Sequence, residues 1–356
     1  MKKIKILHII PTLARGGAER CVVDLMNNAG SDFVAEVLLL KNVQPRAEEL
    51  RVSPHICARR GFFDFNYVRR LAQVIKDINP DIVHTHLWGA DYWGRKAAAL
   101  AGVPIVTTEH NLDFGESCFR HFLKRRTARL AKVHVAASQA IARYAEKFYR
   151  AKNLEVIRYG IELKKFTDLK VADFSGVIQV LMLGRLVTQK GHFIGLEALA
   201  KSGIDFHLRV VGDGELRGAL EKKAQRLRIA DRVAFLPATG NVIGEFVQSD
   251  ILLMPSLWEG LGIVAEEAMA AGRVVVASEV DGLAELLQNG ITGYYFPRGD
   301  VSKAAEVLRF IATHPADARQ TAQAARAFAE NNFAVEEMVV KYEDIYRRVL
   351  EEKISV

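Results

Sequence analysis

The chain has 356 residues, half of them hydrophobic, and a formal net charge of +7. This length exceeds what one hydrophobic core usually organises, so we expect two well-buried domains and exclude a disordered or fibrous protein. The positive charge admits nucleic acid, anionic lipid or a phosphorylated small molecule as a partner, without choosing among them.

The expected location follows from the apolar runs and the cysteines. No apolar run approaches the roughly 20 residues that a membrane-spanning helix needs. The apolar start at residues 4–10 contains His8 and is followed by Pro11, so we interpret it as a first strand and not as a signal peptide. The three cysteines are widely separated and odd in number, which favours a reducing compartment. We therefore expect a cytoplasmic protein.

Short β-branched runs alternate with helix-patterned stretches along the whole chain, as in the βαβ units of a parallel sheet. Strands are predicted at residues 4–10, 34–40, 82–85, 105–108 and 133–137, then at 177–183, 206–211, 233–236, 251–254 and 274–277. This pattern predicts an α/β chain of two Rossmann-like, doubly wound parallel-sheet domains with a hinge near residue 165. The helix-patterned tail at residues 334–352 is expected to pack back on the first domain.

Gly16 and Gly17 follow the first predicted strand and precede an amphipathic run. Paired glycines let a backbone approach a ligand closely, and the start of the following helix attracts an anion. A tight turn that needs positive φ explains an isolated glycine pair equally well. The spacing lacks the G-x-G-x-x-G fingerprint, which lowers the case for an NAD enzyme.

The most informative segment is residues 258–272. Pro255 ends a buried strand, and glycines then lead into a helix predicted to begin near Leu261. Glu259 stands in the loop and Glu267 on the helix. Two such carboxylates can accept hydrogen bonds from sugar hydroxyls, while the helix N-terminus between them faces a diphosphate.

A diphosphate beside carboxylates needs cations. Arg185 directly follows the predicted strand at 177–183, and Lys190 comes five residues later. Both would emerge at the carboxyl edge of the second sheet, although two cations standing alone would indicate only a surface loop. The sequence contains no Asp-x-Asp pair, the usual handle for a divalent ion, so we expect Arg and Lys to replace a metal.

Three histidines and one turn complete the candidate set. His110 follows the strand at 105–108, but a lone histidine is more often structural than catalytic. His84 and His86 share one face of a strand and suggest a metal pair. Without an evident third ligand we interpret them as cleft or packing residues. The turn at 212–215 is expected to shape the loop beside the donor.

Taken together, these segments resemble glycosyltransferase family 4 over nearly the whole chain. The matching segments are Gly16–Glu19, His110, and residues 159–161, 184–186, 189–191, 212–215, 281–285 and 289–290. The pair of Glu259 and Glu267, eight residues apart, is the most specific feature. The resemblance implies the GT-B fold, in which two Rossmann-like domains face each other across a cleft, and transfer of a sugar with retention of anomeric configuration.

The resemblance also implies a division of labour between the domains. Residues 1–163, with the tail helix at about 338–356, would form the acceptor side, and residues 164–337 the donor side. Arg185 and Lys190 would bind the donor diphosphate, and the loop of Gly16 and Gly17 would close onto it. His110 would lie near the reacting sugar carbon.

The remaining implied contacts concern the sugars. Glu267 would hold the ribose hydroxyls, and Glu259 would contact the transferred sugar. Backbone amides from Gly260 through Leu261 to Gly262 would assist. These residues make His110, Glu259, Arg185 and Lys190 the implied catalytic set. The sequence departs from the usual pattern at Tyr159, Gln189, Pro237 and Arg273, which leaves the base and the donor sugar open.

The implied activity is hexosyl transfer from a UDP-sugar, or a GDP-sugar, to a glycan or lipid-linked acceptor in surface polysaccharide, lipopolysaccharide or glycolipid biosynthesis. The nucleotide-sugar is a substrate, and no cofactor or metal is expected. A nucleotide-sugar epimerase of the same fold and a non-catalytic nucleotide-sugar-binding subunit are the alternatives. Nucleic acid is not expected as a partner, because no recognisable motif supports it.

A basic, phenylalanine-containing segment at Phe119–Lys132 suggests an anionic membrane surface as a further partner. A solvated helix face explains the same composition equally well. The first interpretation places the protein peripherally on the inner face of the cell membrane.

Overall fold

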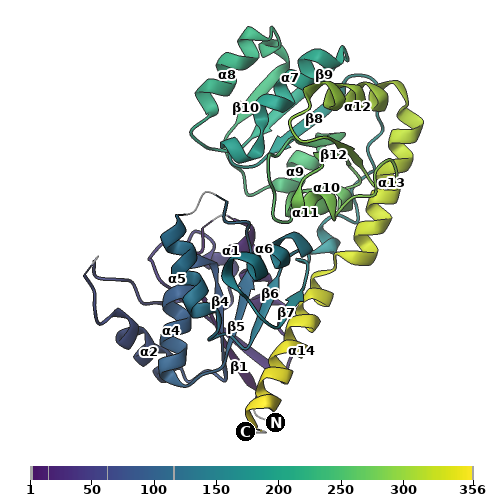
Figure 1. Cartoon of the computed structure of the whole chain (residues 1–356). Helices are drawn as coiled ribbons and strands as arrows, with labels where there is room; N and C mark the ends of the chain where they lie inside the picture. The colour runs from purple at the N-terminus through teal and green to yellow at the C-terminus, as the bar shows by residue number, and fades with distance from the viewer. Residues whose placement is uncertain (1–2, 15, 62, 115–116, 355–356) are drawn as a thin grey trace. The chain divides into compact units, whose positions relative to one another are not determined.

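The computed structural model describes residues 3–14, 16–61, 63–114 and 117–354. The chain divides into two compact units, the first formed by residues 1–160 and 335–356 and the second by residues 161–334. Figure 1 shows a sheet covered by helices in each unit. Among the described residues, no helix is both long enough and apolar enough to cross a bilayer.

The first unit contains a parallel sheet whose described strands run in the order β3-β2-β1-β4-β5-β6-β7. Helices cover both faces of a parallel sheet, and the central strands are therefore buried along nearly their whole length. The strands are β1 (Ile4–Ile10), β2 (Phe33–Leu39), β3 (His55–Ile56), β4 (Ile82–His86), β5 (Ile105–Glu109), β6 (Val133–Ala136) and β7 (Leu154–Val156). Its helical elements are α1 (Gly17–Asn27), η1 (Ala47–Glu49), α2 (Tyr67–Ile78), α3 (Leu87–Gly89), η2 (Ala90–Gly94), α4 (Arg95–Ala101), α5 (Cys118–Ala128), α6 (Gln139–Tyr149) and α14 (Val335–Ile354).

Local signals set the ends of these helices. The Ser138 hydroxyl accepts a hydrogen bond from the Ile141 amide at 3.2 Å, which caps the start of α6. The same helix ends at Arg150, whose φ of 54° is left-handed. The tail helix α14 belongs to the first unit, as Figure 1 shows. Glu343 of α14 accepts a hydrogen bond from the Gly30 amide at 2.7 Å, which attaches the helix to the loop before β2.

The second unit repeats this architecture with described strands in the order β10-β9-β8-β11-β12-β13. These are β8 (Ile178–Leu183), β9 (Phe206–Val211), β10 (Val233–Leu236), β11 (Ile251–Met254), β12 (Val274–Ser278) and β13 (Tyr294–Phe296). The helices are α7 (His192–Ser202), α8 (Arg217–Arg226), α9 (Val242–Val247), α10 (Ile263–Ala270), α11 (Asp281–Ala284), α12 (Val301–Thr313) and α13 (Pro315–Asn332). Buried apolar clusters line both faces of this sheet.

Both sheets reverse their direction of winding between two adjacent central strands. The reversal lies between β1 and β4 in the first unit and between β8 and β11 in the second. Loops at the carboxyl ends of such strands diverge to opposite sides and leave room for a ligand. The architecture therefore marks one candidate site in each unit, and both contain residues singled out by the sequence.

The expected doubly wound organisation is confirmed, and the interior strands lie within two residues of their predicted ends. The strands β3, β7 and β13 were not predicted. Each has two or three residues and lies at the edge of its sheet, where one neighbour is enough and the hydrophobic alternation is too short to recognise.

Candidate functional site

The second-unit site is built from the loops after β8 and β11. These strands are neighbours, so their carboxyl ends bring residues 184–191 beside residues 255–262. Lys190 and Glu259 meet there, with 2.5 Å between Nζ and Oε2. Their side chains are 19% and 12% exposed, so the ion pair is well shielded yet within reach of a ligand.

Gln189 connects Arg185 to the same loop pair. Its side-chain oxygen accepts a hydrogen bond from Arg185 Nη2 at 3.2 Å, while its amide nitrogen donates to the Trp258 carbonyl at 3.2 Å. The backbone amide of Leu257 donates to the Gln189 carbonyl at 2.7 Å. An uncharged amide can both accept and donate here, which an acidic side chain could not. Gln189 therefore links Arg185 to the loop that carries Glu259. From the sequence it was noted only as a departure from the family pattern.

Gly191 allows the two loops to approach. Its φ is 63°, and a Cβ atom placed on it would lie 1.9 Å from the Pro255 carbonyl oxygen. A side chain would clash with backbone and could not rotate away, so the contact between the loops requires glycine.

The glycine-rich segment before α10 also lies close to a neighbouring part of the chain, the Leu283 side chain of α11. Gly262 caps the helix with a φ of 98°, and a Cβ there would lie 2.6 Å from a Leu283 methyl carbon. The helix begins at Ile263, two residues later than expected, so Glu267 lies four residues inside it. Glu267 is 9% exposed. The Glu259 carbonyl accepts a hydrogen bond from the Gly282 amide at 3.0 Å, which holds the loop against α11.

The turn at 212–215 supports this edge of the sheet. The Leu186 amide donates to the Asp213 carbonyl at 2.9 Å, and the Leu216 amide donates to the Leu186 carbonyl at 3.1 Å. The turn thus shapes the loop that carries Arg185, as the sequence predicts. The structure places Arg185, Lys190 and Glu259 in one connected group, and Glu267 lies on α10, the helix that follows this loop.

In the first unit, Gly16 and Gly17 stand at the start of α1. Gly16 is extended, with a φ of −157°, so the positive-φ turn offered as an alternative reason for the glycine pair is wrong. A Cβ on Gly16 would lie 2.3 Å from a carboxylate oxygen of Glu19. The bare backbone here leaves room for that side chain at the helix start.

His110 belongs to a line of hydrogen-bonded imidazoles that we call the histidine row: His8, His86 and His110. His8 Nδ1 lies 3.0 Å from His86 Nε2, and His86 Nδ1 lies 2.9 Å from His110 Nε2. His110 Nδ1 is in turn hydrogen-bonded to the Tyr159 hydroxyl. Sequence reasoning missed His8 and the contact of Tyr159. The signal was available for His8, because a histidine interrupts the apolar run of β1 and the β1–β4 pairing sets it opposite His84.

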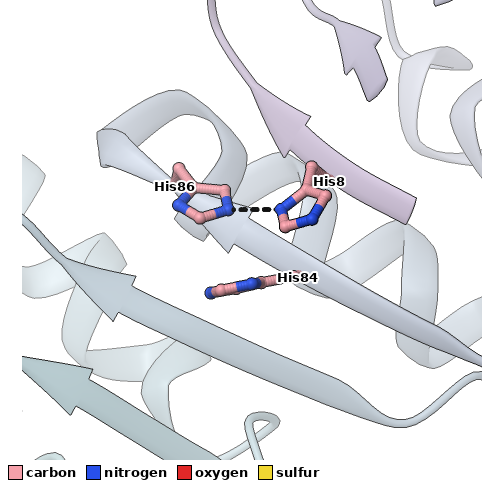
Figure 2. A group of neighbouring side chains, drawn as sticks. All are labelled: His8, His84 and His86. Atoms are coloured by element: carbon pink, nitrogen blue, oxygen red, sulfur yellow. Dashed lines mark hydrogen bonds between the residues drawn. The ribbon is translucent and has the colours of Figure 1, made fainter. Parts of the chain in front are cut away.

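His84 lies beside the row, and His8 is the third imidazole that the sequence did not reveal (Figure 2). The reason given for discounting a metal, the lack of a third ligand, was therefore wrong. Two imidazoles bound to one tetrahedral ion at about 2.0 to 2.1 Å hold their ring centres roughly 5 Å apart. The rings of His84 and His86 are 4.0 Å apart. His84 also uses its Nδ1 on the Tyr346 hydroxyl at 2.7 Å and its Nε2 on the Thr108 hydroxyl at 2.8 Å. This arrangement fits hydrogen bonding better than a tetrahedral metal cage.

All four imidazoles are buried, with at most 7% of the residue exposed. Burial lowers the pKa of His8 to about 3 and that of His110 to about 3. Burial, with the neighbouring imidazoles, holds the pKa values of His84 and His86 well below the usual range. The histidines are consequently neutral near pH 7, and His110 cannot act there as an imidazolium acid.

The basic segment after His110 contains an unexpected buried charge. Lys124 of α5 is 4% exposed, and its Nζ lies 2.6 Å from Glu109, 3.2 Å from Asp91 and 3.2 Å from Asp113. Burial alone would lower the pKa of Lys124, but these carboxylates raise it well above its usual range. Neither interpretation of Phe119–Lys132, as a membrane surface or as a solvated helix face, therefore applies to Lys124. Arg125, Arg126, Arg129 and Lys132 are exposed.

Comparison with known proteins finds a matching family description for each half of the chain. The family description Glycosyltransferase Family 4 matches residues 15–165, and Glycosyl transferases group 1 matches residues 166–328. A UDP-Gal:α-D-GlcNAc-diphosphoundecaprenol α-1,3-galactosyltransferase of Escherichia coli is 28% identical over 344 residues, covering 86% of this chain and 87% of that protein. An N-acetyl-α-D-glucosaminyl L-malate synthase of Bacillus anthracis is 26% identical over 316 residues, covering 81% and 80%.

A solved structure shares the fold over nearly the whole chain. Anabaena HepE in complex with UDP and glucose superimposes with a TM-score of 0.86 at 22% identity, covering 97% of this chain and 100% of that one. The predicted GT-B fold, with its two Rossmann-like parallel sheets, is confirmed. The chain belongs to glycosyltransferase family 4 and is a glycosyltransferase of the GT-B fold.

Proposed function

We propose that this enzyme is a retaining, metal-independent glycosyltransferase that takes a sugar from a nucleoside diphosphate, UDP in preference to GDP, and transfers it to a glycan or lipid-linked acceptor. The observation that carries the donor assignment is the 2.5 Å contact of Lys190 with Glu259 at the winding reversal of the second sheet. The E. coli relative is named for UDP-Gal and a diphosphoundecaprenol acceptor, and HepE was solved with UDP and glucose. Both names support the proposal.

The donor half of the site provides two cations and a helix start. Arg185 and Lys190 neutralise the diphosphate as it departs, and the amides of Gly260, Leu261 and Gly262 face it from the start of α10. When Lys190 turns to the phosphate, Glu259 is released to accept hydrogen bonds from hydroxyls of the transferred sugar. Glu267 holds the ribose hydroxyls. Since the fixed cations do the work of a divalent ion, the reaction needs no metal and no cofactor.

The acceptor half lies in the first unit. His110 stands directly after β5 and would position donor or acceptor as a neutral imidazole. The loop of Gly16 and Gly17 is assigned the role of closing onto the donor, as the family resemblance implies. Retention follows if the acceptor attacks from the face that the phosphate leaves. The departing phosphate oxygen then takes the acceptor's proton, and no covalent enzyme nucleophile is required.

A donor screen tests this function. The purified enzyme is incubated with UDP-, GDP- and ADP-sugars, with and without undecaprenyl-diphosphate-linked or free glycan acceptors, and free nucleotide and glycosylated product are measured. The expected result is slow hydrolysis of one donor alone and faster, acceptor-dependent transfer that retains the anomeric configuration. Isomerisation of the donor without acceptor would show an epimerase, and binding without turnover for every donor and acceptor would show a non-catalytic subunit.

A lipid-linked acceptor requires the enzyme to reach a membrane, and the surface of α5 and α6 fits one. Phe119 and Phe122 on α5 are 67% and 51% exposed, and Phe148 on α6 is 40% exposed. His121 of α5 and the Tyr144 hydroxyl of α6 are 2.8 Å apart, so the two helices form one surface. Apolar rings among exposed arginines match an anionic bilayer interface. We assign this face to peripheral contact with the inner leaflet of the cell membrane, in surface polysaccharide, lipopolysaccharide or glycolipid biosynthesis.

A further inference from the structure

The histidine row is continuous from the middle of the sheet to its carboxyl edge. His8 lies within β1, His86 ends β4, and His110 follows β5, so three adjacent strands each contribute one ring. The row passes through both nitrogens of His86 and both nitrogens of His110. It ends at the hydroxyl of Tyr159, which is 4% exposed. Every member is therefore shielded from water that could supply a substitute partner.

A neutral imidazole carries one N–H donor and one acceptor, so the row admits two polarities. In the first, the Nδ1–H of His8 donates to His86, the Nδ1–H of His86 donates to His110, and the Nδ1–H of His110 donates to the Tyr159 oxygen. In the second, the Tyr159 hydroxyl donates to His110 Nδ1, and the Nε2–H groups of His110 and His86 donate back toward His8. In either polarity all three histidines have the same tautomer.

We propose that Tyr159 and His86 are positioning residues for His110 in the transfer reaction, and that by engaging both of its ring nitrogens they hold the imidazole in one orientation and one tautomer. This inference rests on the proposed role of His110 near the reacting sugar. A ring held at both nitrogens presents the same edge and face in every turnover, which lowers the entropy lost on reaching the transition state. The partner at Nδ1 comes from Tyr159, the last residue but one of the first unit's main segment.

The structure provides a matched control for Tyr159. The Tyr346 hydroxyl makes the same kind of bond to an imidazole in the same unit, 2.7 Å from His84 Nδ1, but His84 is not a member of the row. Tyr346→Phe and Tyr159→Phe each remove one buried phenol oxygen and keep the ring. A loss of packing or stability alone should affect the two variants alike, whereas positioning of His110 should be affected only by Tyr159→Phe.

The experiment combines side-chain ¹⁵N spectra of the histidines with steady-state kinetics. In the wild-type enzyme at pH 7, His8, His86 and His110 are expected to show one shared neutral tautomer. Tyr159→Phe should move the His110 Nδ1 resonance and lower kcat about tenfold, while the donor KM changes less than about twofold. Tyr346→Phe should leave both the His110 spectrum and kcat unchanged.

Each other outcome overturns the inference. Mixed tautomers in the wild-type row, stoichiometric metal that co-purifies with the enzyme and broadens these resonances, or equal kcat losses in the two variants would do so. The wild-type spectrum decides the first two even if Tyr159→Phe does not fold. If no donor is turned over but the shared tautomer is present, the proposed function fails while the row itself stands.

Discussion

Lys190 and Glu259 are 69 residues apart in sequence, yet their side chains form a 2.5 Å ion pair because β8 and β11 are neighbours at the winding reversal of the second sheet. Each charge keeps the other oriented before any ligand arrives. A donor that offers a diphosphate to the lysine and hydroxyls to the glutamate can replace the pair without leaving either charge unsatisfied.

Removing either member should abolish most of the activity. We expect Lys190→Ala and Glu259→Ala each to lower kcat/KM for transfer by about 100-fold or more, because each removes a charge or hydrogen bond strongest in the transition state. Both should keep the wild-type far-ultraviolet spectrum. Lys223→Ala breaks the ion pair with Glu197 between α8 and α7 and should stay within about twofold of wild type. Full activity in either site variant would refute the donor site.

Gly191→Ala should separate a backbone clash from a conformational preference. At Gly191 the added Cβ meets the Pro255 carbonyl oxygen, whereas at Gly203, whose φ is 72°, it meets nothing within 4 Å. We expect Gly203→Ala to cost about 1 kcal/mol of unfolding free energy, and Gly191→Ala roughly 1 to 3 kcal/mol more together with weakened UDP binding. Urea titration and nucleotide binding measure the two effects. Equal costs would show that the loops do not need this close approach.

Activity should persist in excess EDTA. Arg185 and Lys190 carry fixed charge, so stripping divalent ions removes nothing that the leaving diphosphate requires. Transfer rates are compared before and after chelation, with a metal-dependent transferase as the control for effective chelation. Loss of activity that Mg²⁺ or Mn²⁺ restores would show that the cations do not replace a metal.

Acid should destabilise the first unit before its carboxylates titrate. In the folded protein the pKa values of His8 and His110 are about 3, well below the ordinary value of 6.5. Between pH 6.5 and pH 3 the unfolded chain therefore binds more protons than the folded protein does. The contribution of these neutral histidines to the free energy of unfolding is therefore complete above pH 6.5 and is lost as the pH falls toward 3. Each buried histidine contributes a slope of up to about 1.4 kcal/mol per pH unit. Denaturation between pH 7 and pH 5 measures it.

Substitution tests which histidines set that slope. His8→Gln should make the loss of unfolding free energy between pH 7 and pH 5 smaller, because one suppressed protonation is removed. His207→Gln makes the same substitution at an exposed histidine of the second unit and serves as the matched control. A slope that does not respond to His8→Gln would contradict the assignment.

Membrane contact should depend on the exposed charges of α5 and not on the buried one. We expect the double variant Arg125→Glu and Arg126→Glu to lose co-sedimentation with vesicles of phosphatidylcholine and phosphatidylglycerol at low salt. Arg347→Glu with Arg348→Glu makes the same charge change on α14 and should bind as wild type. Equal losses would mean that only net charge matters, and unchanged binding in the α5 variant would remove the membrane assignment.

The interior strands and the doubly wound order could be predicted because buried parallel strands are rich in apolar, β-branched residues and alternate with helix-patterned stretches. Arg185, Lys190 and Glu259 could be placed in loops that follow such strands for the same reason. The helix start at Ile263 was predicted two residues early because a run of Gly, Leu and Gly favours neither end strongly.

Other features depend on contacts between distant segments and cannot be seen in a linear pattern. Lys124 looked like one more surface cation, and only the fold shows three carboxylates from separate segments converging on it. His8 looked like an interruption in a strand until the pairing of β1 with β4 placed it opposite His84 and within hydrogen-bond distance of His86. The contact of Tyr159 with His110 joins the end of one segment to the end of β5, which no local periodicity reports.

The buried ion pair of Lys124 with Glu109 fixes the distance between α5 and the end of β5. The Lys124 ammonium group ties α5 to Glu109, and Glu109 is the residue immediately before His110. Pulling the helix away would strand buried carboxylates at a cost of about 3 to 5 kcal/mol. In the proposed membrane contact, a lipid surface on α5 would therefore lie at a constant distance from His110. That distance would set how far an acceptor must extend from its lipid anchor to be glycosylated.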